Sequence, residues 1–276
     1  MEKSTQKTIA FEVCCPNLES VCNATGAFAA LPGGFGEERG YYYSTRIELC
    51  SALSLGGITP SYGLIKEARN CCTVAGNSSK IKLNVLIRCR EGDFLYSDSE
   101  IALMCEEIRA SADNGADGVV VGALTPDGRV DIPASGKMVE LAHKLGLQVT
   151  FHRAIDRSQN ILQALEDVVS LGAERILTSG GAESAYKGLG MIAKMNGIAG
   201  GRVSIMPGAG VNPANAREII TKSGSNEIHF SASAKYPSPM IYRGGVSFTP
   251  DILGGDFTRL SSSEKLIKET IFAVLG

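Results

Sequence analysis

The chain has 276 residues, 44% of them hydrophobic, and its 27 basic and 29 acidic residues give a formal net charge of −2. No basic stripe or acidic tail stands out, which excludes nucleic acid and membrane surfaces as expected partners. The polar start MEKSTQK lacks the apolar core of a signal peptide, and no apolar run reaches the roughly 18–20 residues of a membrane span. We therefore expect a cytoplasmic protein.

Eight runs rich in Val, Ile and Leu recur along the chain and predict strands. They cover residues 9–15, 45–50, 82–88, 118–124, 148–154, 175–180, 202–207 and 227–233. Between them lie stretches with helical periodicity, such as NILQALEDVVSLGAE, and several of these end in a glycine that is typical of a helix stop. Alternating strands and helices favour an α/β fold with a parallel sheet, and eight units predict a single-domain (β/α)8 TIM barrel over 1–276. A doubly wound open sheet is the alternative.

Two segments depart from this rhythm. Residues 31–44, LPGGFGEERGYYYS, predict an inserted surface loop on the barrel face opposite the site, and their three tyrosines leave a homo-oligomer contact open as the alternative. Residues 234–261 are rich in Gly and Pro and predict an irregular segment. The run SSSEKLIKETIFAVL after it predicts the closing helix.

The pattern Glu-x-Cys occurs twice, as Glu12-Val13-Cys14 and Glu48-Leu49-Cys50, each at the end of a predicted strand. Residues two apart on a strand share a face, so each copy points a carboxylate and a thiol the same way. If the two strands are neighbours, we expect both the thiols and the carboxylates to converge. The pattern therefore predicts either a metal site or a site of chemistry, whereas most of the other cysteines are interpreted as small core residues.

The ends of the predicted strands collect polar residues that a buried strand does not need. Arginine forks suit an anionic ligand, and glycines after the seventh strand occupy the place where barrels often hold phosphate. The expected ligand-binding residues are Arg46, Arg88, Asp93, Ser179, Gly208, Gly210 and His229. A barrel interior filled by Glu–Arg pairs, without a ligand, is the alternative.

Histidine is the side chain best suited to proton transfer near neutral pH. His152 lies at a strand end, where nearby acids are expected to tune it, so the catalytic candidates are His152, Glu12 and Glu48. His229 is placed equally well, with a hydrogen-bonded core histidine as its alternative interpretation. His143 falls in a predicted helix and is expected at the surface.

Several long runs occur in a fixed order between residues 11 and 233: FEVC, RIELCSALSLGGITPSYGL, IRCREGDFLYSD, GADGVVVGALTPDGRVD, VTFHRAID, ALEDVVSLGAERILTSG, MPGAGV and EIHFSAS. Together they resemble the copper homeostasis protein CutC family. The resemblance implies a TIM barrel and an association with copper through the cysteines that match Cys14 and Cys50. The loop that begins at Arg88 departs from the family's Arg-Pro-Arg-Gly-Gly-Asp-Phe by carrying Cys89 and Glu91.

Two hypotheses follow, and the sequence leaves open whether the protein is an enzyme. The first is a copper homeostasis protein that binds Cu(I) through Cys14 and Cys50, with Met206 as a third ligand, since Cu(I) prefers thiolate and thioether sulfur. The second is an enzyme that acts on an anionic or phosphorylated small molecule and uses His152 with Glu12 or Glu48 as an acid–base pair. A barrel that binds such a ligand without turnover is a third alternative.

Overall fold

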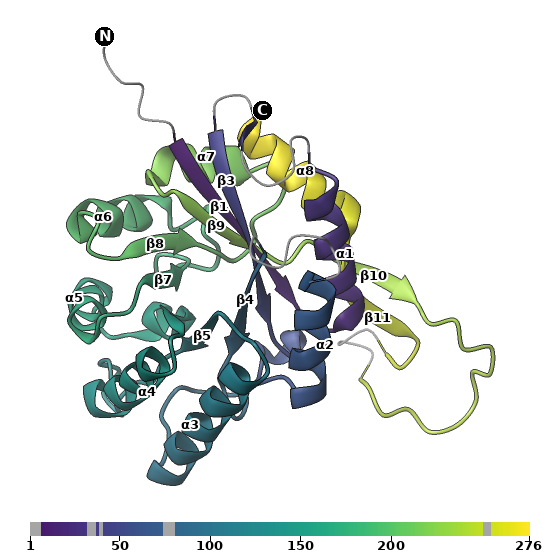
Figure 1. The fold of residues 1–276 in the computed structure, drawn as a ribbon, viewed down its shortest axis with the longest axis horizontal. Helices are drawn as coiled ribbons and strands as arrows, with labels where there is room; N and C mark the ends of the chain where they lie inside the picture. Colours follow the sequence, from purple (N-terminus) through teal and green to yellow (C-terminus); the bar gives the residue numbers. More distant parts are fainter. Residues whose placement is uncertain (1–6, 32–36, 39–40, 74–80, 251–254) are drawn as a thin grey trace.

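The computed structural model describes residues 7–31, 37–38, 41–73, 81–250 and 255–276. Within these residues, eight parallel strands alternate with eight helices around a nearly closed barrel (Figure 1). The predicted (β/α)8 fold is therefore confirmed. No helix in the described part of the chain is long and apolar enough to cross a membrane.

The barrel strands match the eight predicted runs, although several end earlier than predicted. They are β1 (Lys7–Cys15), β3 (Tyr41–Leu49), β4 (Ile81–Leu86), β5 (Gly118–Val121), β6 (Gln148–Phe151), β7 (Arg175–Thr178), β8 (Ser204–Pro207) and β9 (Glu227–Phe230). The helices are α1 (Leu18–Ala29), α2 (Tyr62–Cys72), α3 (Asp98–Asp113), α4 (Ile132–Lys144), α5 (Ile161–Leu171), α6 (Leu189–Ala199), α7 (Ala216–Ser223) and α8 (Glu264–Leu275). Two 3-10 turns, η1 (Leu53–Leu55) and η3 (Arg153–Arg157), follow β3 and β6.

The strand order is β8-β7-β6-β5-β4-β3-β1-β9, and each neighbouring pair in this order is parallel. β8 and β9 are the two ends of the order, and no strand pairing joins them among the described residues. β9 pairs with β1, so the last barrel strand lies beside the first. This neighbourhood brings residues near 229 to residues near 12.

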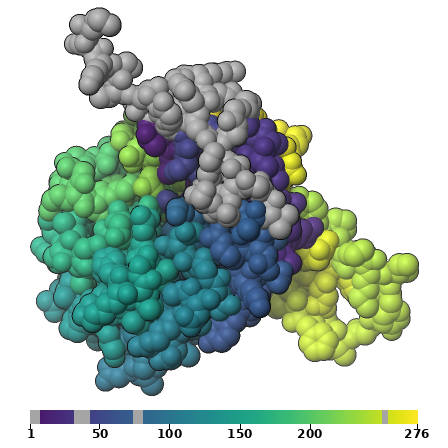
Figure 2. Space-filling model, viewed as in Figure 1, coloured from purple at the N-terminus to yellow at the C-terminus, as the bar shows by residue number. Residues whose placement is uncertain are grey.

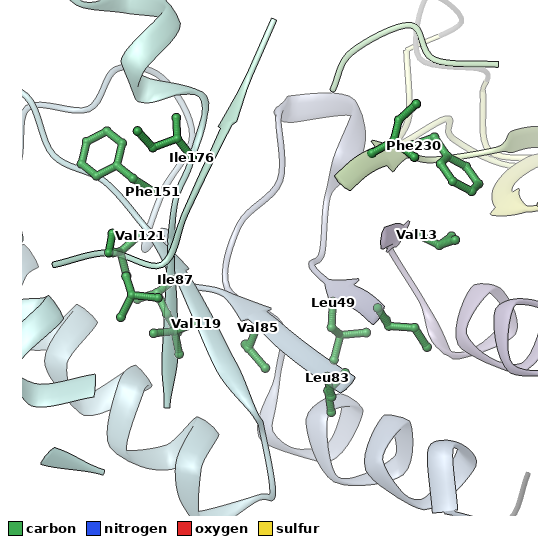
Figure 3. Packing of buried hydrophobic residues seen from close by; sticks show 14 of the residues in the cluster. Val13, Leu49, Leu83, Val85, Ile87, Val119, Val121, Phe151, Ile176 and Phe230 are labelled. Carbon is green, nitrogen blue, oxygen red and sulfur yellow. The ribbon is translucent and has the colours of Figure 1, made fainter. Parts of the chain in front are cut away.

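Alternation along the strands separates two layers of side chains. On β1, Phe11, Val13 and Cys15 belong to the main apolar core with the helices, and Val13 is seen with Leu49 and other strand residues in Figure 3. Cys14 points the other way and packs with Cys50 in a separate cluster. The same alternation that builds the core thus directs Cys14 and Glu12 into the barrel.

The expected surface loop over 31–44 is wrong for residues 41–44, which form the first part of β3. Residues 41–44 are extended and pair with the start of β1. Tyrosine is common in strands, so the tyrosines of this run are compatible with this pairing. Tyr43 is only 5% exposed. Glu37–Glu38 form β2, which pairs antiparallel with the start of β3, while residues 32–36 and 39–40 lie outside the described part.

The segment 234–261 is not irregular throughout, because both of its ends are strands. β10 (Ser233–Pro237) and β11 (Thr258–Ser262) form an antiparallel two-stranded sheet. Residues 238–250 between them project away from the barrel (Figures 1 and 2). α8 follows β11 and packs against α1 and α7, which confirms the predicted closing helix.

Candidate functional site

The carboxyl ends of the barrel strands surround a cavity of about 460 Å³. Cys14 lines it from β1, Glu48 from β3, Cys50 from just beyond β3, and His229 from β9. The loops after β4, β6 and β8 add Arg88, His152, Arg153 and Gly210. The cavity therefore lies at the barrel end where catalytic and binding residues of this fold collect.

The two Glu-x-Cys copies lie side by side but are not level with each other. In the β1–β3 register, Glu12 is beside Arg46 and Cys14 is beside Glu48. The thiols still meet, with the Sγ atoms of Cys14 and Cys50 3.6 Å apart. The predicted convergence of the thiols is thus present, although the second copy is displaced along the strand by two residues.

His229 links the two carboxylates. Its Nδ1 lies 2.8 Å from Glu12 Oε1, and its Nε2 lies 3.8 Å from Glu48 Oε2. All three side chains are buried. Burial opposes protonation of His229, but Glu48 and Glu12 outweigh it and raise the pKa of the imidazole. Burial raises the pKa of the Glu48 carboxyl, whereas Arg46 and His229 overcome burial at Glu12 and hold its pKa well below the usual range.

The donor atoms around the thiols form a candidate metal site. One donor atom each from Cys14, Glu48 and His229 lie within 4.8 Å of one another, which is the only such cluster among the described residues. Cys50 adds a second sulfur beside Cys14. Histidines that bind metals commonly donate their other N–H to a carboxylate, and Glu12 stands in that position toward His229. The set of two thiols and an imidazole fits a soft metal ion.

Arg46 lies below this site in a buried ion network rather than on the cavity wall. Its Nε contacts Glu12, and its Nη2 lies 2.5 Å from Glu227 Oε2. Arg175 Nε reaches the same Glu227 oxygen at 2.6 Å. Met206 also packs here, with its Sδ 3.2 Å from Arg46 Nη2, and it does not line the cavity, whereas His229 does. These buried ion pairs are the Glu–Arg pairs that the sequence analysis gives as an alternative filling of the barrel interior.

Arg88 lines the cavity, yet both of its terminal nitrogens, Nη1 and Nη2, donate to the backbone. It donates to Gly57 O at 2.7 Å, Gly92 O at 2.7 Å and Leu55 O at 3.2 Å. Arg88 thereby joins the loops that follow β3 and β4. Asp93, which was expected beside it as a ligand-binding residue, pairs instead with Arg90 at 3.1 Å on the exposed side of the second loop.

The expectation that acids tune His152 is wrong. Its ring packs at 5.0 Å from the Phe94 ring, and its Nδ1 accepts a hydrogen bond from Ala154 N at 3.2 Å. Burial and the charge of Arg88 lower its pKa to about 3. The histidine that lies between the acids is His229. The predicted eightfold barrel could have indicated this, because closure of a barrel makes the last strand a neighbour of the first.

The remaining predicted residues shape the loops around the cavity. Ser179 Oγ lies 2.9 Å from Asp156 Oδ2, and Asp156 also accepts from the backbone N–H groups of Ser179 and Gly181. Asp156 was missed by the sequence interpretation, although it follows His152 in the same run. Gly210 lines the cavity, and a Cβ at Gly208 would stand only 2.5 Å from Leu177 Cδ1 and 3.2 Å from the His229 ring. Gly208 therefore makes room for both side chains.

Comparisons with known proteins agree on one family. The sequence model of the CutC family matches residues 9–234. A protein of Vibrio cholerae serotype O1 described as family protein CutC is 42% identical over 263 residues, which is 95% of each chain. One from Aliivibrio fischeri is 44% identical over 233 residues, covering 84% of this chain and 85% of the relative.

A comparison with solved structures agrees with this family. A structure described as a candidate copper homeostasis protein CutC from Streptococcus agalactiae superposes with a TM-score of 0.68 and 30% identity, covering 81% of this chain and 98% of that one. A thiamine phosphate pyrophosphorylase from Pyrococcus furiosus superposes with a TM-score of 0.53 at 15% identity, covering 98% and 96% of the two chains. The second likeness concerns the barrel fold alone.

Proposed function

The chain belongs to the CutC family, and from this premise we propose that it is a copper homeostasis protein that binds Cu(I) through Cys14 and Cys50. The observation that carries the proposal is the pair of Sγ atoms 3.6 Å apart in the cavity lining, next to His229 and Glu48. Cu(I) prefers thiolate ligands and accepts low coordination numbers, so two sulfurs with one imidazole suffice.

The surroundings of the thiols support a bound soft ion. Cys14 is 3% exposed and Cys50 is 1% exposed, so bulk water has little access to either sulfur. Glu12 fixes the orientation of His229 through a 2.8 Å contact to Nδ1, which leaves Nε2 directed to the side of Glu48. A histidine oriented in this way binds metal with little loss of side-chain freedom.

The test is an anaerobic titration in which the protein competes with a Cu(I) chelator of known affinity. The wild type is expected to hold one Cu(I) tightly at this site, and Cys14→Ser/Cys50→Ser is expected to lose that site. Cys22→Ser/Cys71→Ser is the matched control, because it removes two thiols that are also 3.6 Å apart but lie outside the cavity. Unchanged affinity in the first double variant contradicts the proposal.

A second function is favoured by one specific observation, the buried histidine held between two acids at the same cavity. We propose His229 with Glu12 and Glu48 as the acid–base group of an enzyme acting on an anionic or phosphorylated small molecule. Groups with opposite pKa shifts in one site are typical of proton transfer. The side chain of Arg153 lines the cavity where an anion would bind.

This second function is tested with inorganic phosphate and small sugar phosphates in a thermal-shift assay. A ligand of the cavity is expected to raise the melting temperature of the wild type and of Cys14→Ser/Cys50→Ser alike. Arg153→Ala is expected to reduce the shift, because it removes one of the two arginines, Arg88 and Arg153, that line the cavity. Absence of any shift with all of these anions argues against an anionic substrate.

A further inference from the structure

A second pair of thiols lies on the outside of the barrel. Cys22 is on α1 and Cys71 is near the end of α2, two helices that pack against each other (Figure 1). Their Sγ atoms are 3.6 Å apart. Cys22 is exposed, whereas Cys71 is half-buried and packs against the edge of the apolar core, so the pair lies at the surface and outside the cavity.

The surroundings of this outer pair favour a disulfide over a bound metal. The only cluster of three or more His, Cys, Asp or Glu donors in the described chain is the one at Cys14, so the outer thiols have no third ligand of these types. A disulfide needs an S–S distance of about 2.05 Å, and the sulfurs must therefore approach by about 1.5 Å. A disulfide at this site therefore requires rotation of the two cysteine side chains toward each other.

We propose that Cys22 and Cys71 are an oxidation site at which hydrogen peroxide forms an intramolecular disulfide between α1 and α2. The exposed Cys22 sulfur attacks the peroxide oxygen, which breaks the O–O bond and gives a sulfenic acid and one water. The Cys71 sulfur then attacks the Cys22 sulfur, the S–S bond forms, and the second water leaves. Two thiols lose two electrons and two protons, and hydrogen peroxide is reduced to two waters.

Accessibility decides the order of the two steps and the choice of the pair. Cys22 meets the oxidant first because it is exposed, whereas burial and the contact with Cys22 raise the pKa of Cys71 to about 11. Cys71 thus acts as the resolving thiol. Cys14 and Cys50 have the same separation, but both are buried, and the contact with Cys50 together with burial raises the pKa of Cys14 well above its usual value. Oxidation should therefore select the outer pair.

The experiment treats the reduced full chain with hydrogen peroxide, blocks the remaining thiols and maps the peptides by mass spectrometry. One cross-linked peptide pair containing Cys22 and Cys71 is expected, with a loss of two hydrogens. Cys22→Ser and Cys71→Ser should each abolish it, and Cys14→Ser/Cys50→Ser should form it as the wild type does. Because 49 positions separate the two cysteines, the cross-link should raise the melting temperature by about 10 °C.

Three results would overturn the proposal. They are a cross-link between Cys14 and Cys50, a dimer joined through Cys22, and oxidation of Cys22 beyond the sulfenic acid while Cys71 stays reduced. The last two results identify a different chemistry for the exposed thiol and leave Cu(I) binding at the cavity untouched. A Cys14–Cys50 cross-link would also remove the two thiols proposed as Cu(I) ligands, and the Cu(I) titration of the reduced protein keeps the two proposals distinguishable.

Discussion

The two thiol pairs of this protein have the same separation and opposite surroundings. Cys14 and Cys50 lie inside the barrel beside His229 and Glu48, and the outer pair lies between two surface helices. The inner sulfurs have nitrogen and oxygen donors near them and little access to water. The outer sulfurs lie at the surface and belong to no cluster of three such donors in the described chain. The difference teaches that the environment, rather than the distance, decides between metal binding and disulfide formation.

Charged residues show the same division between the inside of the barrel and its outer surface. Arg46 is buried and contacts two buried acids, Glu12 and Glu227. Arg202 is exposed and pairs with the exposed Glu166. A buried ion is stable only while all of its partners are present, whereas water can replace the partner of an exposed ion. The comparison can be tested by removing one partner on each side.

The largest effect is expected for Arg46→Met, which keeps much of the side-chain volume but leaves Glu12 and Glu227 without this cation. The free energy of unfolding should fall by about 3–5 kcal/mol in urea titrations. Arg202→Met is the control on the outer surface and should cost less than about 1 kcal/mol. Equal losses in the two variants would show that the inner network is as well hydrated as the surface pair.

A smaller effect is expected from pH, because His152 is buried as the neutral imidazole. Its pKa falls from 6.5 to about 3, so its contribution to stability is complete above pH 6.5 and is lost as the pH falls toward 3. Each pH unit in this range costs about 1.4 kcal/mol. Between pH 6.5 and 5, the wild type should therefore lose about 2 kcal/mol more than His152→Gln.

Urea titrations at a series of pH values measure this difference. His143→Gln serves as the control, because His143 lies on α4 with an exposed side chain. If His152→Gln keeps the full pH slope of the wild type, burial of the neutral ring is not its source. Restricting the comparison to pH 5 and above keeps most carboxyl groups ionised in both proteins.

The smallest effect is expected for His229→Gln in the Cu(I) titration. The variant keeps both thiols and can still donate a hydrogen bond to Glu12, but it removes the imidazole from the donor set. Affinity should fall by about tenfold, which is far less than the loss expected without the thiols. His143→Gln should bind Cu(I) as the wild type does. An unchanged affinity in His229→Gln would limit the site to sulfur ligands.

The fold could be predicted from the sequence because each barrel strand leaves a local pattern of apolar residues. The register could not, since sliding one strand along another changes no local pattern. The two Glu-x-Cys copies look equivalent in the sequence, but the register sets Glu12 beside Arg46 and Cys14 beside Glu48. The thiols converge because Cys50 lies just beyond β3, beside the end of β1.

The choice between the two strand-end histidines also depended on long-range order. His152 and His229 occupy similar positions in their runs, yet β9 pairs with β1, and β6 pairs with β5 and β7. Of these pairings, only that of β9 with β1 brings a histidine beside Glu12. The contact between Cys22 and Cys71 was not predictable for a related reason, because it depends on how α1 and α2 are rotated against each other.

The projecting segment 238–250 has a consequence for handling the protein. Ile241 is 94% exposed and Phe248 is 91% exposed, and the segment forms no part of a sheet. A protease that cleaves after aromatic residues should therefore cut first after Tyr242 or Phe248. The nicked chain should stay together in native buffer, because β11 pairs with β10 and α8 packs against α1 and α7. It should separate into two fragments only when it is denatured.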